Sequence, residues 1–366
     1  MGMPTGCNSP ASETGKPDEP QTPTEEETGK IETPAFARGA DISWYSEMVY
    51  NGKVFRDRNG QEKPLPEVLK SLGMNAVRLR VWCNPDLKWN GTEDVVNKAI
   101  AATKAGLAVM IDFHYSNFFA DPGRQNIPDA WKGLSLSDMG AELGKHTTTV
   151  LQALKDEGIT PAWIQVGNET RNGMLWDVCR LWNNSGEIAG GWAAYAKLSN
   201  VGYTASKAVF PDTPVIIHLN NAWENNEWWF KRFLDEGGKM DIIGLSHYPM
   251  SETGQEWKAV NSLAIKNIKD LSQKFNRPVM VCEIGVKISS ITQGKACIQD
   301  FMDQARKIDK CVGVFYWEPE VYGGWKPAIY NDVSKYVPGQ KVWNAYEMGA
   351  FLDNGQPTDI LAPFAE

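Results

Sequence analysis

The stretch at residues 161–169, PAWIQVGNE, is apolar through Val166 and then ends abruptly in Gly-Asn-Glu. A short apolar run of this kind is typical of a buried strand in a parallel sheet. Functional side chains lie where such a strand ends, so we expect Glu169 to face the open end of the sheet. A second run at 278–285, PVMVCEIG, has the same form and carries Glu283. Two carboxylates, each at the end of an apolar strand, predict a glycosidase.

On both sides of 161–169, a unit of one strand and one helix repeats along the chain. Gly73, Gly106 and Gly158 each follow a predicted helix and precede a predicted strand, as expected of glycine in the left-handed position past a helix end. The pattern predicts strands at 38–44, 75–82, 107–115, 161–169, 214–220, 241–248, 279–283 and 312–318. It predicts helices at 65–72, 94–104, 137–157, 192–209, 227–236, 263–275, 295–308 and 342–351.

Eight such units predict an α/β fold, a (β/α)8 TIM barrel, with a single catalytic domain at residues 34–366. The competing architecture is a doubly wound open sheet. It is disfavoured because no GxGxxG or GxxxxGK[ST] run follows any of the predicted strands.

Composition and charge argue against several classes of function. The 366 residues are 42% hydrophobic and 22% charged, which is ordinary for a soluble globular protein. A formal net charge of −8 argues against a nucleic-acid or anionic-membrane partner. No apolar run approaches the roughly 20 residues of a transmembrane helix. The chain has 15 Trp residues, and Trp offers a flat, amphipathic surface to the apolar face of a sugar ring.

Residues 1–33 differ in composition from the rest of the chain. They are rich in Pro, Thr and Glu and nearly lack aliphatic side chains, so we expect a disordered tail. The opening residues MGMPTG resemble a cloning remnant, and a natural export signal would then have been removed. Cys7 could be the acylated cysteine of a bacterial lipoprotein with the tail as a tether, or an ordinary free thiol.

The residues at the predicted strand ends form a polar and aromatic set, and a barrel brings them to one face. The candidates for substrate binding are Trp44, Arg80, Trp82, Asp112, His114, Asn168, Asn220, His247, Tyr248, Trp317 and Glu318. Within this set, Asn168 could donate to the sugar hydroxyl next to the reacting carbon, and Trp317 could form the floor under the ring. The two histidines could instead be hydrogen-bonded wall residues, and the first two tryptophans could be partly core.

Two carboxylates about 5–5.5 Å apart permit retaining hydrolysis of a glycosidic bond. Glu169 is the expected proton donor, because a neighbouring negative charge helps a carboxyl group to keep its proton near neutral pH. Glu283 supplies that charge and is the expected nucleophile. Arg80 and Tyr248 are the candidates for the groups that keep it ionised, although Arg78 offers the same charge two residues away.

Several motifs together resemble glycoside hydrolase family 53, the endo-β-1,4-galactanases. The resemblance runs from about residue 36 to residue 363 and includes GAD at 39–41, VRLRVW at 77–82, DFHYS at 112–116, ADPG at 120–123, VGNE at 166–169, GLS at 244–246 and YWEP at 316–319. It implies a clan-A barrel and a retaining double displacement, with Glu169 as acid/base and Glu283 as nucleophile. The implied substrate, and the only partner that we expect, is the β-1,4-galactan of pectic rhamnogalacturonan I (type I arabinogalactan).

The resemblance also implies that catalysis requires no cofactor. Bacterial members can hold a structural calcium ion, and no run of Asp and Asn at ligand spacing tells whether this chain does. The four His residues, none of them in an HExxH arrangement, disfavour a catalytic zinc site. We expect an extracellular or cell-surface monomer.

The chain departs from the family pattern at Asn117, Phe119, His247 and residues 284–286, which puts subsite number and product length in doubt. Two alternatives remain. One is another clan-A polysaccharide hydrolase, such as a β-mannanase or cellulase. The other is a non-catalytic surface glycan-binding protein, which is disfavoured because both carboxylates are present.

Overall fold

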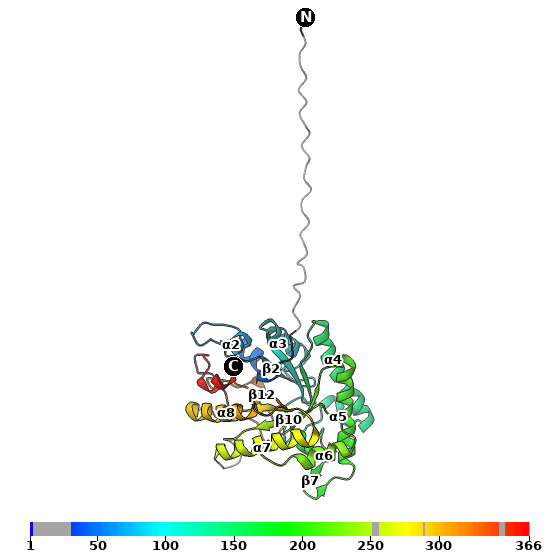
Figure 1. Cartoon of the computed structure of the whole chain (residues 1–366). Coiled ribbons are helices and arrows are strands. Elements are labelled where there is room, and N and C mark those ends of the chain that lie inside the picture. Colours follow the sequence, from blue (N-terminus) through cyan, green and yellow to red (C-terminus); the bar gives the residue numbers. More distant parts are fainter. Residues whose placement is uncertain (3–30, 251–255, 288–289, 344–347, 366) are drawn as a thin grey trace.

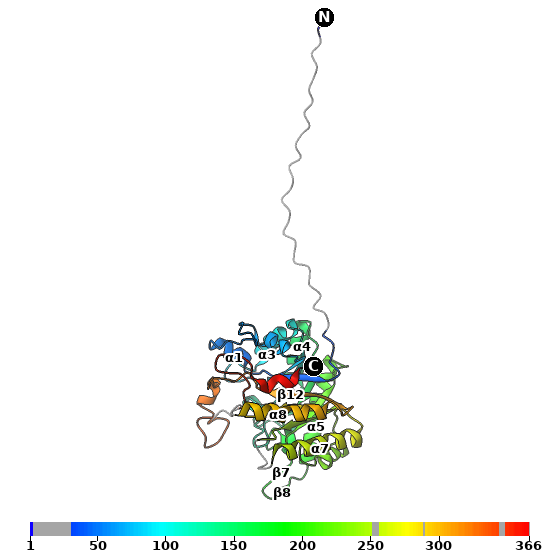
Figure 2. The same ribbon diagram turned by 60° about the vertical axis from the view of Figure 1, so that its left-hand side comes forward.

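The computed structural model describes residues 1–2, 31–250, 256–287, 290–343 and 348–365. Within these ranges, parallel strands close into a barrel in the order β1-β12-β11-β10-β9-β4-β3-β2. Helices surround the barrel (Figure 1; Figure 2 gives a second view). The predicted (β/α)8 barrel is confirmed.

The barrel strands lie within two residues of the predicted positions at most of their ends, and the helices follow the same alternation. The strands are β1 (Ala37–Asp41), β2 (Ala76–Val81), β3 (Ala108–Phe113), β4 (Trp163–Val166), β9 (Val215–Leu219), β10 (Ile242–His247), β11 (Val279–Ile284) and β12 (Cys311–Trp317). The helices are α1 (Tyr45–Tyr50), α2 (Leu65–Ser71), α3 (Thr92–Lys104), α4 (Leu136–Asp156), α5 (Gly191–Val209), α6 (Glu227–Asp235), α7 (Trp257–Phe275) and α8 (Ile291–Ala305).

Glycine conformation explains why several helices end where the sequence predicts. Gly73, Gly106 and Gly158 have φ angles of 90°, 74° and 71°. These values lie in the left-handed region, which side chains with a Cβ atom adopt at a cost. Each glycine therefore ends its helix and turns the chain into the next strand.

The prediction of a closing helix at 342–351 is wrong for the residues of this range that the structure describes. Residues 348–351 are not helical, and 344–347 lie outside the described residues. The N–H of Ala350 instead donates to the carbonyl of Pro319 in the loop after β12, and the carbonyl of Ala350 accepts from Thr358. Backbone groups used in this way cannot form a helix. The chain ends with a 3₁₀ helix, η5 (Asp359–Phe364), that packs against α8.

The sequence also did not predict the insertion between β4 and α5. It contains a 3₁₀ helix, η2 (Thr170–Asn172), and two short antiparallel pairs, β5 (Gly173–Met174) with β6 (Cys179–Arg180) and β7 (Trp182–Asn183) with β8 (Gly186–Glu187). Because the insertion follows the end of a barrel strand, it lies on the same face as the other strand ends.

Two apolar layers stabilise the barrel. One lies between the strands and the helices. The other fills the N-terminal end of the barrel and contains Trp163 and Phe315, whose ring centroids are 5.9 Å apart. Gly39 leaves the space that the Phe315 ring occupies, since a Cβ atom there would lie 2.2 Å from it. With the N-terminal end of the barrel closed by packing, a ligand can enter only at the opposite end.

The predictions for the N-terminal tail fall mainly on residues 3–30, which include Cys7 and lie outside the described residues. Among the described helices, none combines the length and the apolar character needed to cross a membrane.

Candidate active site

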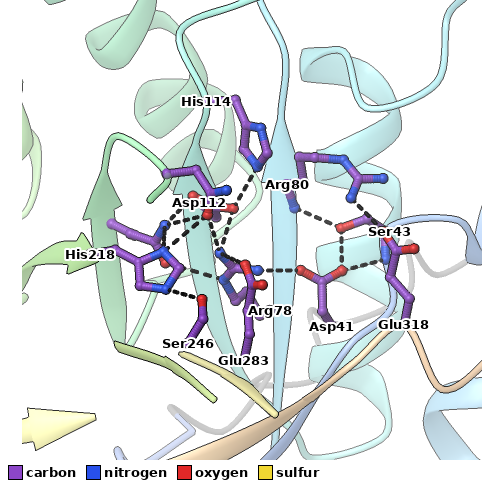
Figure 3. A network of polar contacts seen from close by, with 12 residues as sticks. Asp41, Ser43, Arg78, Arg80, Asp112, His114, His218, Ser246, Glu283 and Glu318 are labelled. Carbon is purple, nitrogen blue, oxygen red and sulfur yellow. Dashed lines mark hydrogen bonds and ion pairs between the residues drawn. The ribbon is translucent and has the colours of Figure 1, made fainter. Parts of the chain in front are cut away.

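A layer of polar side chains lies inside the barrel, above the apolar layer. Side chains alternate along a strand, so Arg78 and Arg80 point inward from β2, whereas Val77 and Leu79 pack outward against the helices. The guanidinium of Arg78 lies 2.8 Å from Asp41 on β1 (Figure 3). A fully buried cation requires such partners, because its desolvation is costly.

Glu283 reaches the barrel interior through a β-bulge. Leu245 of β10 pairs with Val281 of β11, but the next residue, Ser246, pairs with Glu283, so one extra residue stands in β11. Without the bulge, strict alternation would place Glu283 on the helix side, since Cys282 already points into the barrel layer. A bulge changes the direction of the side chain that follows it.

Two groups hold the Glu283 carboxylate. Its Oε1 lies 3.0 Å from the Arg78 guanidinium, and its Oε2 accepts a 2.5 Å hydrogen bond from the Tyr248 hydroxyl. The expected contact between Glu283 and Tyr248 is present, but the prediction that Arg80 contacts Glu283 is wrong. Arg80 lies one inward position further along β2, where it pairs with Glu318 at 2.6 Å.

Burial raises the pKa of the Glu283 carboxyl above its ordinary value, and Arg78 and the Tyr248 hydroxyl oppose this rise. The pKa of Tyr248 is raised, first by burial and then by the negative charges of Glu283 and Glu169. Tyr248 therefore keeps its proton and can act as a donor to Glu283.

Glu169 follows β4 in a left-handed turn, with φ = 47° and ψ = 50°. Its backbone N–H points to Nδ1 of His218 on β9, 3.4 Å away. Burial lowers the pKa of Arg171, two residues further on, and the negative charge of nearby Glu169 opposes this lowering. The turn places Glu169 at the rim of the barrel, 9% exposed.

Glu169 and Glu283 line one cavity of about 290 Å³. Of the predicted substrate-binding residues, the cavity wall includes His114, Asn168, Asn220, Tyr248 and Trp317. The sequence did not single out as site residues the other members of the wall, which are Phe119, Ala120, Asp121, Pro122, Asn221, Tyr330, Trp343 and Met348. Tyr330 and Trp343 come from the long segment after β12, whose path the strand-and-helix pattern does not predict.

Six predicted substrate-binding residues lie behind the cavity wall and are at most 1% exposed, namely Trp44, Arg80, Trp82, Asp112, His247 and Glu318. Arg80 lies over the rings of Trp44 and Trp82, 4.5 and 5.1 Å from their centroids. The indole N–H of Trp44 donates to Glu318 at 3.0 Å. All four side chains are at most 1% exposed, and none of them lines the cavity.

His247 faces away from the barrel interior. Ser246 precedes it on β10 and points inward, where its hydroxyl lies 2.9 Å from Nε2 of His218. By alternation His247 points outward, and its Nε2 lies 2.8 Å from Oδ1 of Asn261 on α7. Its ring centroid is 4.6 Å from that of Phe301 on α8. His247 therefore belongs to the layer between the strands and the helices.

Asp112 and His114 support the site from β3. Burial alone would raise the pKa of Asp112, but Arg78, 2.8 Å away, and His114 hold it below its usual range. Nδ1 of His114 accepts the backbone N–H of Ala120, so its Nε2 carries the proton and donates to Asp112 at 3.0 Å. Burial also lowers the pKa of His114, which keeps the ring neutral.

The orientation of the Asn168 amide is fixed by two bonds. Its Oδ1 accepts from Arg78 at 2.8 Å, and its Nδ2 donates to the carbonyl of Ala120 at 2.8 Å. An amide nitrogen has two N–H groups, and Asn168 lines the cavity, so a second N–H can serve a ligand there. Gln165, an inward side chain of β4 that the sequence did not single out, accepts from Arg78 and donates to Asp112.

Within the described part of the chain, no group of three or more His, Cys, Asp or Glu side chains is placed to hold a metal ion.

A closed parallel barrel with carboxylates and aromatic rings in one cavity at its C-terminal end defines a (β/α)8-barrel glycosidase. The model of Glycosyl hydrolase family 53 matches residues 37–360. The chain belongs to this family and is a glycoside hydrolase, so the family expected from the motifs is confirmed.

Relatives and solved structures agree with this assignment. An uncharacterized protein of Niallia circulans is 35% identical over 68% of this chain and 67% of its own length. The arabinogalactan endo-β-1,4-galactanase of Thermothelomyces thermophilus is 30% identical over 77% of this chain and 89% of its own length. The endo-β-1,4-galactanase of Bacillus subtilis is 29% identical over 90% of this chain and 85% of its own length.

Two solved structures share this fold over almost their whole length. The family 53 catalytic domain of Ignisphaera aggregans superposes with a TM-score of 0.76 at 25% identity, covering 92% of this chain and 98% of that one. A fungal β-1,4-galactanase superposes with a TM-score of 0.74 at 27% identity, covering 89% and 98%.

Proposed function

We propose that this protein is a retaining endo-β-1,4-galactanase that hydrolyses internal bonds of pectic galactan (type I arabinogalactan). The observation that carries the proposal is that Glu169 and Glu283, from β4 and β11, line the same cavity. The names of the relatives from Thermothelomyces thermophilus and Bacillus subtilis support the choice of β-1,4-galactan as substrate.

In the first step, the Glu283 carboxylate attacks the anomeric carbon while Glu169 donates its proton to the departing glycosidic oxygen. This forms a covalent galactosyl-enzyme. In the second step, Glu169 takes a proton from a water molecule, which attacks the same carbon and releases Glu283. The contacts with Arg78 and Tyr248 support the nucleophile role, because both groups favour the ionised carboxylate.

The neighbouring groups have defined tasks in this scheme. The N–H of Asn168 on the cavity side donates to the hydroxyl beside the reacting carbon, and Trp317 forms the floor under the ring. Both residues line the cavity with the two glutamates, which supports these roles. All of these steps use protein side chains and water, so catalysis requires no cofactor.

The proposed substrate is a plant cell-wall polymer, so we infer that the protein acts outside the cell or at its surface. Cys7 is the proposed point of lipid attachment and residues 8–33 the tether. Labelling with a fatty-acid analogue in the native host tests this, and incorporation of the label into a Cys7→Ser variant would refute it. We propose that the protein acts as a monomer, which sedimentation or light scattering measures directly.

Digestion of potato-type galactan, with sizing of the products over time, tests the activity. Endo action predicts a rapid fall in viscosity with mixed oligosaccharides, and NMR of the first products should show retained β configuration. Activity on mannan or cellulose but not on galactan would reject the proposed substrate. Glu169→Gln and Glu283→Gln should each lower kcat by about a hundredfold to ten-thousandfold with unchanged melting behaviour. A near-normal rate in either variant would reject the assigned roles.

A further inference from the structure

An exposed tryptophan lies in the first turn of α6. Trp228 has 48% of its surface exposed, which is unusual for so large an apolar side chain. Trp182, on β7 of the insertion after β4, lies beside it with ring centroids 5.7 Å apart and an interplanar angle of 71°. We call this pair the aromatic platform. Trp228 is exposed and Trp182 is half-buried, so the pair offers a flat aromatic surface to a ligand.

The aromatic platform is held in place from both sides. Asn172 binds the backbone of Trp182 twice, accepting its N–H at 2.7 Å and donating to its carbonyl at 3.1 Å. The Trp182 ring packs edge-on against buried Trp192, at 5.4 Å. Arg232 of α6 forms an ion pair with Glu187 of β8, which ties the hairpin to the helix. The rings therefore keep their positions without a ligand, and binding costs little ordering entropy.

The same elements connect the aromatic platform to the cavity. Arg171, two residues after Glu169, donates to Oδ1 of Asn220 at 2.8 Å and to its carbonyl at 3.0 Å, and also donates to Asn226. Asn226 in turn donates to the carbonyl of Asn221 at 3.2 Å, and both Asn220 and Asn221 line the cavity.

Trp228 is therefore close to the cavity wall. It stands two residues after Asn226, which precedes the first residue of α6. Two residues advance a helix by about 3 Å, so Trp228 belongs to the segment that runs from the cavity wall at Asn220 and Asn221 into α6.

We propose that Trp228, supported by Trp182, binds the galactan chain beyond the catalytic cavity, as a distal subsite that selects polymer over short oligosaccharides. The inference rests on the proposed function, because its occupant is the same polymer. The apolar C–H face of a galactose ring lies on the exposed indole. The sugar hydroxyls remain in water or reach the polar side chains at the rim.

The size of the cavity explains why a polymer needs such a surface. A volume of about 290 Å³ is at the lower end for sites that enclose a small molecule, so a long chain must leave the cavity. An enzyme that cuts internal bonds has chain on both sides of the reacting ring. In this proposal, one of these two sides leaves the cavity past Asn220 and Asn221 and reaches Trp228.

The test compares Trp228→Ala with wild type on long β-1,4-galactan and on β-1,4-galactotetraose. An aromatic anchor contributes on the order of 1–2 kcal/mol, so we expect the ratio of kcat/KM for polymer to kcat/KM for tetraose to fall about tenfold. Most of the change should lie in KM for the polymer. Trp228→Phe keeps a ring and should restore part of the ratio. Leu263→Ala removes another exposed apolar side chain, 42% exposed on α7, and should leave the ratio unchanged.

Two results would overturn the inference. In one, Trp228→Ala lowers both kcat/KM values equally, which indicates a general structural effect. In the other, the ratio stays at the wild-type value. Failure of the proposed function gives a different result, because wild type itself would then release nothing from galactan. The inference would fall with it.

Discussion

Tyr248→Phe removes one hydroxyl group from the cavity and leaves the aromatic ring in place. In wild type, this hydroxyl donates a 2.5 Å hydrogen bond to Oε2 of Glu283. A hydrogen bond to a charged group contributes about 1.5–3 kcal/mol, and one pH unit corresponds to about 1.4 kcal/mol. We therefore expect the acidic limb of the kcat/KM profile to move to higher pH by about one to two units.

The sign follows from the state of the nucleophile. As the proposed nucleophile, Glu283 must be ionised to attack; burial raises its pKa, and Arg78 and the Tyr248 hydroxyl oppose that rise. Without the hydroxyl, the carboxyl takes up a proton at a higher pH. Activity is then lost first on the acidic side, whereas the rate near neutral pH falls less.

The assay measures initial rates of reducing-sugar release from galactan across the acidic and neutral range. Tyr115→Phe is the matched control, because its hydroxyl lies 2.9 Å from Oγ1 of Thr147, away from either glutamate. It should cost about 0.5–1.5 kcal/mol of stability and leave the acidic limb unmoved. If Tyr248→Phe lowers the melting temperature but leaves the limb in place, Glu283 is not the ionisable nucleophile.

The remaining predictions concern stability. Burial raises the pKa of Glu47 to about 7, so the folded state keeps a proton that the unfolded state loses, and this stabilisation disappears as pH rises through about 7. Glu47→Gln removes this titration. We expect the difference in Tm between Glu47→Gln and wild type to shift in favour of the variant by at least about 2 °C from about pH 5 to about pH 8. An equal difference in Tm at both pH values would contradict the raised pKa of Glu47. His247→Leu leaves Oδ1 of Asn261 without its partner and should cost about 1–3 kcal/mol in urea unfolding, with KM for galactan within about twofold of wild type. A large rise in KM for galactan would instead indicate that His247 contributes to substrate binding.

Local sequence patterns predicted the barrel because each strand and helix is specified within a short window. The apolar runs mark the strands, and glycines such as Gly73 and Gly158 end the helices in a conformation that few other residues adopt. The segment at 342–351 was predicted wrongly for the same reason. The backbone of Ala350 in this segment forms hydrogen bonds with Pro319 and Thr358, which lie outside the segment.

The sequence also identified part of the cavity wall around Glu169 and Glu283, since residues that end parallel strands meet on one face. It could not decide which of Arg78 and Arg80 meets the nucleophile. Both point inward from β2, and only the stagger between neighbouring strands sets their depth relative to Glu283.

By itself, the sequence determined the barrel, the family and the two strand-end glutamates. The spacing of apolar residues, the positions of the glycines and the short motifs are all local properties of the chain. The tertiary structure alone decided where the side chains of these glutamates point. The β-bulge in β11 points Glu283 inward, and it exists only in the pairing of β11 with its neighbouring strands. The placement of Trp228 beside Trp182 likewise depends on the packing of α6 against the insertion after β4. Contacts between residues distant in sequence have no signature in either segment alone.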